Sequence, residues 1–226
     1  YNNFHQIIAQ SDDMKNDLID NFKIHSSKIM KINNPVDFEM INRLKEENIE
    51  QDNHTGYKNI VSIGNLSQRK GFDLLLNVFS YLKNEPIKLT IFGDGRDKEQ
   101  LLIQKNDLQL DNVSFFGKVN NPFPFVKQAD LFILSSRYEG FPNVLLEAGA
   151  CGTYSLANNA PGGINEIIQE GINGEIYDIN DAEDFASRIK QILNKSHQKE
   201  QIIASIESRF SKKVIMNHYE SLFEKL

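Results

Sequence analysis

Short apolar runs alternate along this chain with segments in which apolar residues recur at helical spacing. The runs predict strands at residues 60–63, 89–92, 113–116, 131–134, 153–157 and 175–177. The segments between them predict helices over residues 72–83, 96–108, 123–128, 143–151, 163–170 and 181–193. Continuous apolar strands separated by helices are typical of a parallel sheet covered on both faces. We therefore expect a Rossmann-like, doubly wound α/β fold that binds its ligands beyond the carboxyl ends of the strands.

The first 37 residues have a different organisation. They predict a strand over 6–9, a helix over 14–22 whose N-cap is Ser11, and a second strand over 28–32. The turn-rich sequence at 33–37 then ends regular structure. This unit has too few strands for a sheet of its own, so we expect it to be the end of something larger. The outer segments of the main unit predict a helix over 38–48, a polar connector over 50–58, and one or two helices over 198–226.

The strongest candidate for a binding site is the stretch 135–152, SSRYEGFPNVLLEAGACG, which leads from a strand into a helix. Gly140 lets the backbone pass close to a ligand, and Pro142 suits the first helical turn. The free amides expected at the helix N-terminus form an anion site and belong to Asn143, Val144 and Leu145. The carboxylates of Glu139 and Glu147 flank this site and can accept hydrogen bonds from hydroxyl groups. Each of the two has the alternative interpretation of a solvated surface glutamate.

Loops after three other strands hold further candidates. The loop from Gly64 to Gly71 contains Arg69 and Lys70, which can neutralise a diphosphate or form a solvated basic turn. Gly93-Asp94-Gly95-Arg96 is too short a match for a dinucleotide site, so we interpret it as a strand-to-helix turn. Another glycine and basic residue follow the third strand, in a turn formed by Gly117, Lys118 and Val119.

Composition excludes several classes of protein. The net charge of −6 gives no electrostatic basis for nucleic-acid binding. The single cysteine, Cys151, excludes an intrachain disulfide and is expected to be a small core residue. The five histidines are scattered, so we expect no tightly bound metal. No apolar run approaches the ~20 residues of a membrane span, and the N-terminus does not resemble a signal peptide, which predicts a cytoplasmic protein.

The sequence Glu139-Gly140-Phe141-Pro142, with a second glutamate eight positions after Glu139, resembles the E-x7-E signature of the retaining glycosyltransferases of family 4. The resemblance implies the C-terminal, sugar-donor-binding half of a GT-B fold. It implies that Glu139 contacts the donor hexose, that Glu147 holds the ribose hydroxyls, and that Lys70 binds the diphosphate. The family usually has an arginine where this chain has Asn65, so Arg69 is expected to supply that cation. The complete set of expected donor-binding residues is Gly64, Asn65, Arg69, Lys70, Gly117, Lys118, Val119, Glu139, Gly140, Phe141, Pro142, Asn143, Val144, Leu145 and Glu147.

The resemblance also implies a division of the chain and an activity. Residues 1–37 are expected to end an N-terminal acceptor domain and form the hinge, residues 38–210 to bind the donor, and residues 211–226 to pack back on the N-terminal domain. The implied reaction moves a hexose or N-acetylhexosamine from a nucleotide sugar, commonly a UDP-sugar, with retention of configuration. The implied catalytic residues are Glu139, Lys70 and Arg69, without a cofactor. The resemblance further implies an acceptor that is a glycan, a lipid-linked glycan or a protein, and a full-length enzyme that can contact the inner face of the membrane peripherally.

Most of the family's acceptor-binding domain is not in this sequence, which begins with Tyr1, so we expect the chain alone to bind donor but transfer little sugar. A second hypothesis is a non-catalytic module that binds nucleotide sugars and needs a partner for turnover. A third is a nucleotide-sugar epimerase of related fold. An NAD-dependent dehydrogenase comes last because its fingerprint is absent.

Overall fold

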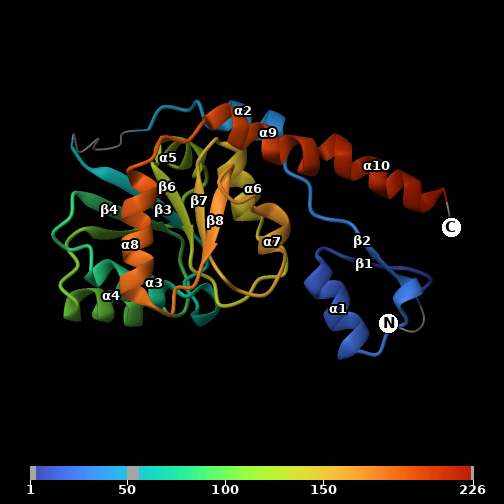
Figure 1. The fold of residues 1–226 in the computed structure, drawn as a ribbon, viewed down its shortest axis with the longest axis horizontal. Coiled ribbons are helices and arrows are strands. Elements are labelled where there is room, and N and C mark those ends of the chain that lie inside the picture. Colours follow the sequence, from blue (N-terminus) through green and yellow to red (C-terminus); the bar gives the residue numbers. More distant parts are fainter. Residues whose placement is uncertain (1–3, 50–55, 225–226) are drawn as a thin grey trace.

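A six-stranded parallel sheet forms the centre of the computed structural model, which describes residues 4–49 and 56–224 (Figure 1). Its strands are β3 (Lys58–Ile63), β4 (Ile87–Phe92), β5 (Val113–Gly117), β6 (Leu131–Leu134), β7 (Ser155–Asn158) and β8 (Gly174–Tyr177). The strand order is β5-β4-β3-β6-β7-β8, and every neighbouring pair is parallel. The chain thus winds outward from β3 to one edge, returns to β6, and winds to the other edge. The predicted doubly wound α/β fold is confirmed.

Helices cover both faces of this sheet because successive strand residues point to opposite sides. Leu131 and Ile133 of β6 join the core beneath α3 (Phe72–Ser80), α4 (Lys98–Asp107) and α8 (Ala182–Leu193). Phe132 and Leu134 join the opposite core. The helices on that side are α5 (Phe123–Gln128), α6 (Asn143–Ala150), α7 (Ile164–Ile167) and α9 (Lys199–Phe210). All four residues of β6 are therefore buried, as the apolar sequence predicts.

The N-terminal unit, residues 7–31, lies to one side of the sheet in Figure 1. It consists of β1 (Ile7–Ala9), α1 (Asp12–Asp20), a short 3-10 turn at Ser26–Lys28, and β2 (Ile29–Lys31). β1 and β2 form a separate parallel pair with a small core of their own. The predicted N-cap is confirmed, since the Ser11 hydroxyl accepts a hydrogen bond from the amide of Met14 at 3.1 Å.

The turn at residues 33–37 contacts the junction between α9 and α10 (Lys212–Phe223). The amide of Val36 donates to the Phe210 carbonyl at 2.8 Å, and Lys212 forms an ion pair with Asp37. Ile215 of α10 lies in the same core cluster as Val36, and α2 (Phe38–Leu44) follows the turn directly. The contacts therefore hold the expected hinge against the C-terminal helices. The division into acceptor and donor domains stays a prediction.

A few boundaries differ from those expected. The helix predicted over 163–170 ends at Ile167, because the chain turns back at Gly171, whose φ is +75°, and the Asn173 side chain accepts from the Gln169 amide at 2.7 Å. The strand predicted over 153–157 begins at Ser155. The C-terminal segment forms two helices, α9 and α10. Residues 50–55 of the predicted connector lie outside the described residues.

Candidate functional site

The loops after β3 and β6 are locked together at the carboxyl edge of the sheet. Gly71 has φ +64°, and a Cβ built on it would lie 2.1 Å from the carbonyl oxygen of Ser135, so only glycine fits there. The Ser135 hydroxyl donates to the Lys70 carbonyl at 2.8 Å, and the Arg137 amide donates to the Arg69 carbonyl at 2.8 Å. These bonds fix the backbone of Lys70 relative to the loop that carries Glu139.

Glu139 is the centre of a buried charged cluster. Its side chain is 5% exposed, and its carboxylate accepts hydrogen bonds from Lys70 Nζ at 2.5 Å, Arg69 at 3.0 Å and the Ser136 hydroxyl at 2.6 Å. A buried carboxylate requires such partners, since removing it from water is costly. The structure brings Glu139, Lys70 and Arg69 together, with the two cations bonded to the glutamate. The sequence predicts that the two cations bind a diphosphate and that the glutamate binds a sugar. Those binding roles stay predictions.

A cleft of about 600 Å³ opens beside this cluster between the loops after β3, β4 and β5. Four of the expected donor-binding residues line it: Gly64, Asn65, Lys118 and Val119. A Cβ built on Gly64 would lie 3.4 Å from three carbons of the Lys70 side chain, so Lys70 packs against a residue that lines the cleft. The cleft therefore adjoins the Glu139 cluster through Gly64 and Lys70.

The sequence missed part of this lining. Gly93, Asp94 and Gly95, which the sequence predicts to form a strand-to-helix turn, also line the cleft. A Cβ on Gly93 would lie 1.9 Å from the carbonyl oxygen of Gly64, and one on Gly95 would lie 2.1 Å from Oδ1 of Asn65. The two glycines thus allow the β3 and β4 loops to touch. The signal available in the sequence was the Gly-x-Gly spacing itself, at a strand's carboxyl end.

Gly117, the last residue of β5, lies next to the cleft without lining it. Its φ is +89° with open space around it, and its carbonyl accepts from the Gly93 amide at 2.9 Å. It is absent from the cleft lining, whereas the two residues after it are part of that lining. Gly117 therefore joins the β4 and β5 loops and orients the turn that follows.

The N-terminus of α6 corrects one prediction. The amide of Leu145 is not free, because it donates to the Pro142 carbonyl at 2.9 Å. The Leu145 side chain is 1% exposed, and Phe141 is also buried, with its ring 5.8 Å from that of Phe210. Phe141 and Leu145 therefore belong to the core, and a ligand could reach only their backbone. The amides of Asn143 and Val144 lie in the first turn, where no carbonyl of the helix precedes them.

Glu147 lies one turn further along α6. Burial raises the pKa of its carboxyl to about 7, because the charged form loses contact with water. Near neutral pH its carboxyl therefore exists in both protonation states. Such a carboxyl can donate a hydrogen bond to a hydroxyl when protonated and accept one from it when ionised, which suits the predicted contact with a ribose.

Cys151 and the acidic residues give no sign of further chemistry. Cys151 is 3% exposed, and burial raises the pKa of its thiol to about 12, as expected of an inert core residue. Within residues 4–49 and 56–224, no three His, Cys, Asp or Glu side chains are placed to hold a metal ion. The absence of a metal in the working protein stays a prediction. In the same part of the chain, no helix is long and apolar enough to cross a membrane.

The N-terminal unit reaches the site through contacts that the sequence did not indicate. Asp13, near the start of α1, accepts from the amide of Gly162 at 2.6 Å. Gly162 has φ +106°, and a Cβ built on it would lie 1.8 Å from the carbonyl oxygen of Glu139. The amide of Glu139 also donates to the Pro161 carbonyl at 2.9 Å. One loop therefore connects α1 with the backbone of Glu139.

Comparisons with known proteins identify a family and agree with the fold. The family model described as glycosyl transferases group 1 matches residues 45–209. An N-acetylgalactosamine-N,N'-diacetylbacillosaminyl-diphospho-undecaprenol 4-alpha-N-acetylgalactosaminyltransferase of Campylobacter jejuni is 29% identical over 188 residues, which are 83% of this chain and 50% of that protein. The lipopolysaccharide core biosynthesis glycosyltransferase LpsE of Rhizobium meliloti is 34% identical over 135 residues, which are 59% of this chain and 39% of that protein. This chain thus spans half or less of the length of these relatives.

Solved structures share the fold. HepE of Anabaena in complex with UDP has a TM-score of 0.83 and 23% identity, over 98% of this chain and 64% of that one. The lipopolysaccharide outer core galactosyltransferase WaaB in its apo form has a TM-score of 0.79 and 24% identity, over 98% of this chain and 62% of that one.

Proposed function

Because this chain belongs to the glycosyl transferases group 1 family, we propose that it supplies the donor site for transfer of a hexose or N-acetylhexosamine from a nucleotide sugar to a glycan or lipid-linked acceptor. One observation carries the proposal. The buried Glu139, bonded to Lys70 and Arg69, lies at the head of α6 beside an open cleft of about 600 Å³. Cations, free helix amides and a carboxylate converge on one edge of the sheet, where such folds bind ligands.

The proposed binding pose of the nucleotide sugar follows from the chemistry of the residues around the site. The nucleotide base enters the cleft against Lys118 and Val119, and the ribose hydroxyls reach Glu147. The diphosphate lies between Lys70 and the amides of Asn143 and Val144, since both attract negative charge. The sugar then lies at Glu139. UDP is the proposed nucleotide, with the UDP named in the HepE structure as support.

The reaction breaks the bond between the anomeric carbon and the phosphate oxygen, so negative charge grows on the leaving diphosphate. Lys70 and Arg69 stabilise that charge, because fixed donors in a partly dry site need no reorganisation during the reaction. When the donor binds, Lys70 and Arg69 exchange part of their hydrogen bonds to Glu139 for hydrogen bonds to the diphosphate. Glu139 then remains as the acceptor for hydroxyls of the sugar, which it holds in a reactive pose. Transfer with retention of configuration is part of the proposal.

The acceptor and the place of action are proposed from the relatives. The Campylobacter relative is named for a lipid-linked diphosphate acceptor, and LpsE for lipopolysaccharide core synthesis. We accordingly place this protein in bacterial surface polysaccharide synthesis, on the cytoplasmic side of the membrane. The acceptor binds mainly to an N-terminal domain that the N-terminal unit completes, and neither a metal nor another cofactor takes part.

The test is sugar transfer by the chain alone and after addition of the N-terminal half of a relative. UDP-sugars carrying a labelled hexose or N-acetylhexosamine are supplied with lipid-linked and glycan acceptors. We expect donor binding by the chain alone and labelled product only in the completed protein. Donor binding without transfer in either form would contradict the enzyme and favour a non-catalytic nucleotide-sugar module.

A further inference from the structure

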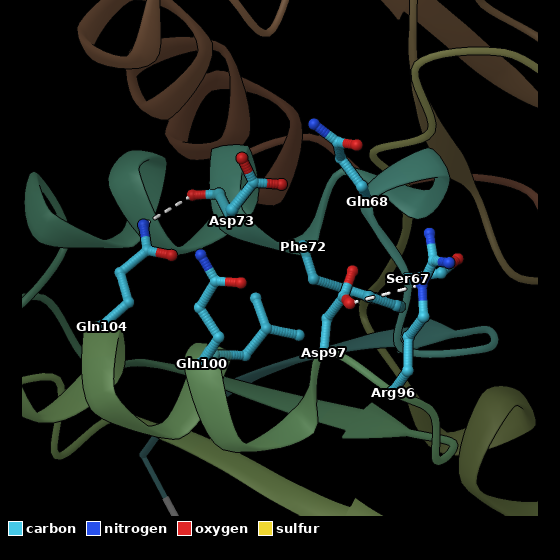
Figure 2. Close-up of a pocket in the computed structure, with 9 residues that line it drawn as sticks. Ser67, Gln68, Phe72, Asp73, Arg96, Asp97, Gln100 and Gln104 are labelled. Carbon is cyan, nitrogen blue, oxygen red and sulfur yellow. Dashed lines mark hydrogen bonds and ion pairs between the residues drawn. The ribbon is translucent and has the colours of Figure 1, made fainter.

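Two hollows lie near the Glu139 cluster and share no lining residue with the cleft. The first, of about 280 Å³, is the groove between α3 and α4 shown in Figure 2. The second, of about 440 Å³, continues from it towards the loop that carries Glu139. Ser67, Gln68 and Arg96 line both, so the two hollows adjoin, and we call them together the arginine groove. None of the donor-site roles proposed above uses these three residues.

The hollow nearer Glu139 is lined largely by guanidinium groups. Its six lining residues include three arginines, from the loops after β3, β4 and β6, together with a tyrosine and no carboxylate: Ser67, Gln68, Arg69, Arg96, Arg137 and Tyr138. Each guanidinium has one carboxylate partner that lies outside this lining: Glu139 for Arg69, Asp97 for Arg96 and Asp73 for Arg137. Guanidinium forks match the oxygens of a phosphoryl group, which they can bind in pairs.

The arginines are held in place while keeping donors for a ligand. Asp73 accepts two hydrogen bonds from Arg137, at 2.7 and 2.6 Å, which fixes the plane of that guanidinium. Arg69 directs one nitrogen to Glu139 and remains 39% exposed. Arg96 is 79% exposed, with Asp97 3.5 Å away. Each guanidinium carries five N–H donors, more than these contacts use.

The other hollow has a different chemistry. Gln100 and Gln104, one turn apart on α4, face it together with the carboxylate of Asp97 (Figure 2). Phe72 and Leu101 form an apolar floor. Gln104 is oriented by a 2.9 Å bond from its amide nitrogen to the Asp73 carbonyl, which leaves its side-chain oxygen as an acceptor. Amide and carboxylate groups over an apolar floor suit the hydroxyls and the C–H face of a sugar ring.

We propose that the arginine groove binds a phosphorylated saccharide, with its phosphoryl group among Arg69, Arg96 and Arg137 and its hydroxyls at Gln100 and Gln104. The ligand is a second one, additional to the sugar donor. Arg69 contacts both sites, so the phosphoryl group lies beside Glu139. A free sugar phosphate and a phosphorylated unit of a glycan share this chemistry.

The test is calorimetric titration with glucose 6-phosphate, with UDP present at saturation to occupy the donor site. Glucose alone and inorganic phosphate are titrated in parallel. Arg96→Ala is the principal variant, because Arg96 is mostly exposed and can be removed without disturbing the core. Gln104→Ala tests the sugar half of the groove, and Arg43→Ala, a change at an exposed arginine of α2, is the matched control.

We expect the parent protein to bind glucose 6-phosphate more tightly than it binds glucose or inorganic phosphate. Arg96→Ala should bind glucose 6-phosphate about tenfold more weakly than the parent, and Arg43→Ala should bind it with the parent's affinity. UDP binding should be equal in all four proteins. Equal binding of phosphate and glucose 6-phosphate, no binding of glucose 6-phosphate, or equal loss in Arg43→Ala would overturn the proposal. A phosphorylated oligosaccharide that binds more tightly than glucose 6-phosphate identifies a glycan as the source of the group. Failure of UDP to bind would count against the proposed function and not against the groove. Titration of glucose 6-phosphate without UDP would still test the groove.

Discussion

At the level of single residues, the proposed donor site makes Glu139 a competitor of the sugar donor for two cations. Its carboxylate lies 2.5 Å from Lys70 Nζ and 3.0 Å from Arg69. In the proposed site a bound diphosphate would share those cations with Glu139, so the glutamate would weaken the attraction for UDP while providing the contact for the sugar. The two effects have opposite signs and can be separated by substitution.

Glu139→Gln removes the negative charge and keeps the size of the side chain and its ability to accept from Ser136. We predict that UDP binds about fivefold more tightly, on the order of 1 kcal/mol, because Lys70 and Arg69 lose their competing carboxylate. The additional affinity of a UDP-sugar over UDP should disappear. Calorimetry measures both quantities, with Glu183→Gln on the exposed side of α8 as control. Weaker UDP binding in Glu139→Gln would show that the glutamate supports the diphosphate directly.

Glu147 predicts a dependence of stability on pH. Burial raises the pKa of its carboxyl to about 7 in the folded protein, above the usual value of 4.5. The folded state therefore binds more protons than the unfolded state between these values, and stability falls as pH rises through that window. The free energy of unfolding falls by at most about 1.4 kcal/mol per pH unit.

Glu147→Gln should reduce this fall, since glutamine does not ionise. Denaturant unfolding of both proteins at several values between pH 5 and pH 8 measures the difference. The variant should gain stability relative to the parent as the pH rises. A constant difference across the window would mean that the Glu147 carboxyl has an ordinary pKa.

At the scale of elements, the site depends on contacts between loops more than on the helices and strands themselves. The doubly wound sheet was predictable because each strand is a short apolar run and each helix has its own periodicity. The cluster of Lys70 and Glu139 was predictable because both follow strands that end at the same edge. The bond from the Leu145 amide to Pro142 was not, since the geometry of a helix's first turn depends on the loop before it.

Gly162→Ala tests how the loop after β7 supports Glu139. The new Cβ would lie 1.8 Å from the Glu139 carbonyl oxygen, so the loop and the glutamate must move apart. The matched control is Gly171→Ala, where φ is also positive, +75°, and a Cβ meets nothing within 4 Å.

We predict that Gly171→Ala costs roughly 1–2 kcal/mol of stability, from backbone strain alone. Gly162→Ala should cost more than its control and also reduce UDP-sugar binding, which the control should leave unchanged. Chemical unfolding and calorimetry give the two values. Equal losses of stability with normal UDP-sugar binding in both variants would contradict a supporting role for this loop.

At the scale of the whole molecule, Glu166 fastens the N-terminal unit to the sheet. Its carboxylate accepts from the amide of Asp12 at 2.7 Å, from Lys31 at 2.8 Å and from Asn33 at 3.0 Å. Arg209 donates to the Glu166 carbonyl at 2.8 Å, which links the same residue to α9. Sequence patterns could not indicate the three contacts of the Glu166 carboxylate, because they join residues more than 130 positions apart with no periodicity between them.

Glu166→Ala should loosen the N-terminal unit without unfolding the sheet. Three hydrogen bonds are lost, and Lys31 keeps only Asp12 as an ion-pair partner among the described residues. Hydrogen exchange measured by mass spectrometry should become faster in β1, α1 and β2 and stay unchanged in β3 to β8. Glu183→Ala is the control. Uniformly faster exchange over the whole chain would indicate one cooperative unit.

The proposed donor site rests on Lys70 and Glu139, beside the cleft, which bind the donor of a glycosyl transfer. Calorimetric titration with UDP, GDP, ADP, NAD and UDP-sugars tests it most directly, on the parent chain, on Lys70→Ala, and on Lys83→Ala, which changes an exposed lysine after α3. We predict that one nucleoside diphosphate binds, about thirtyfold or more weakly to Lys70→Ala, and equally to Lys83→Ala and the parent. Binding that survives Lys70→Ala, or that Lys83→Ala reduces as much, would contradict the claim.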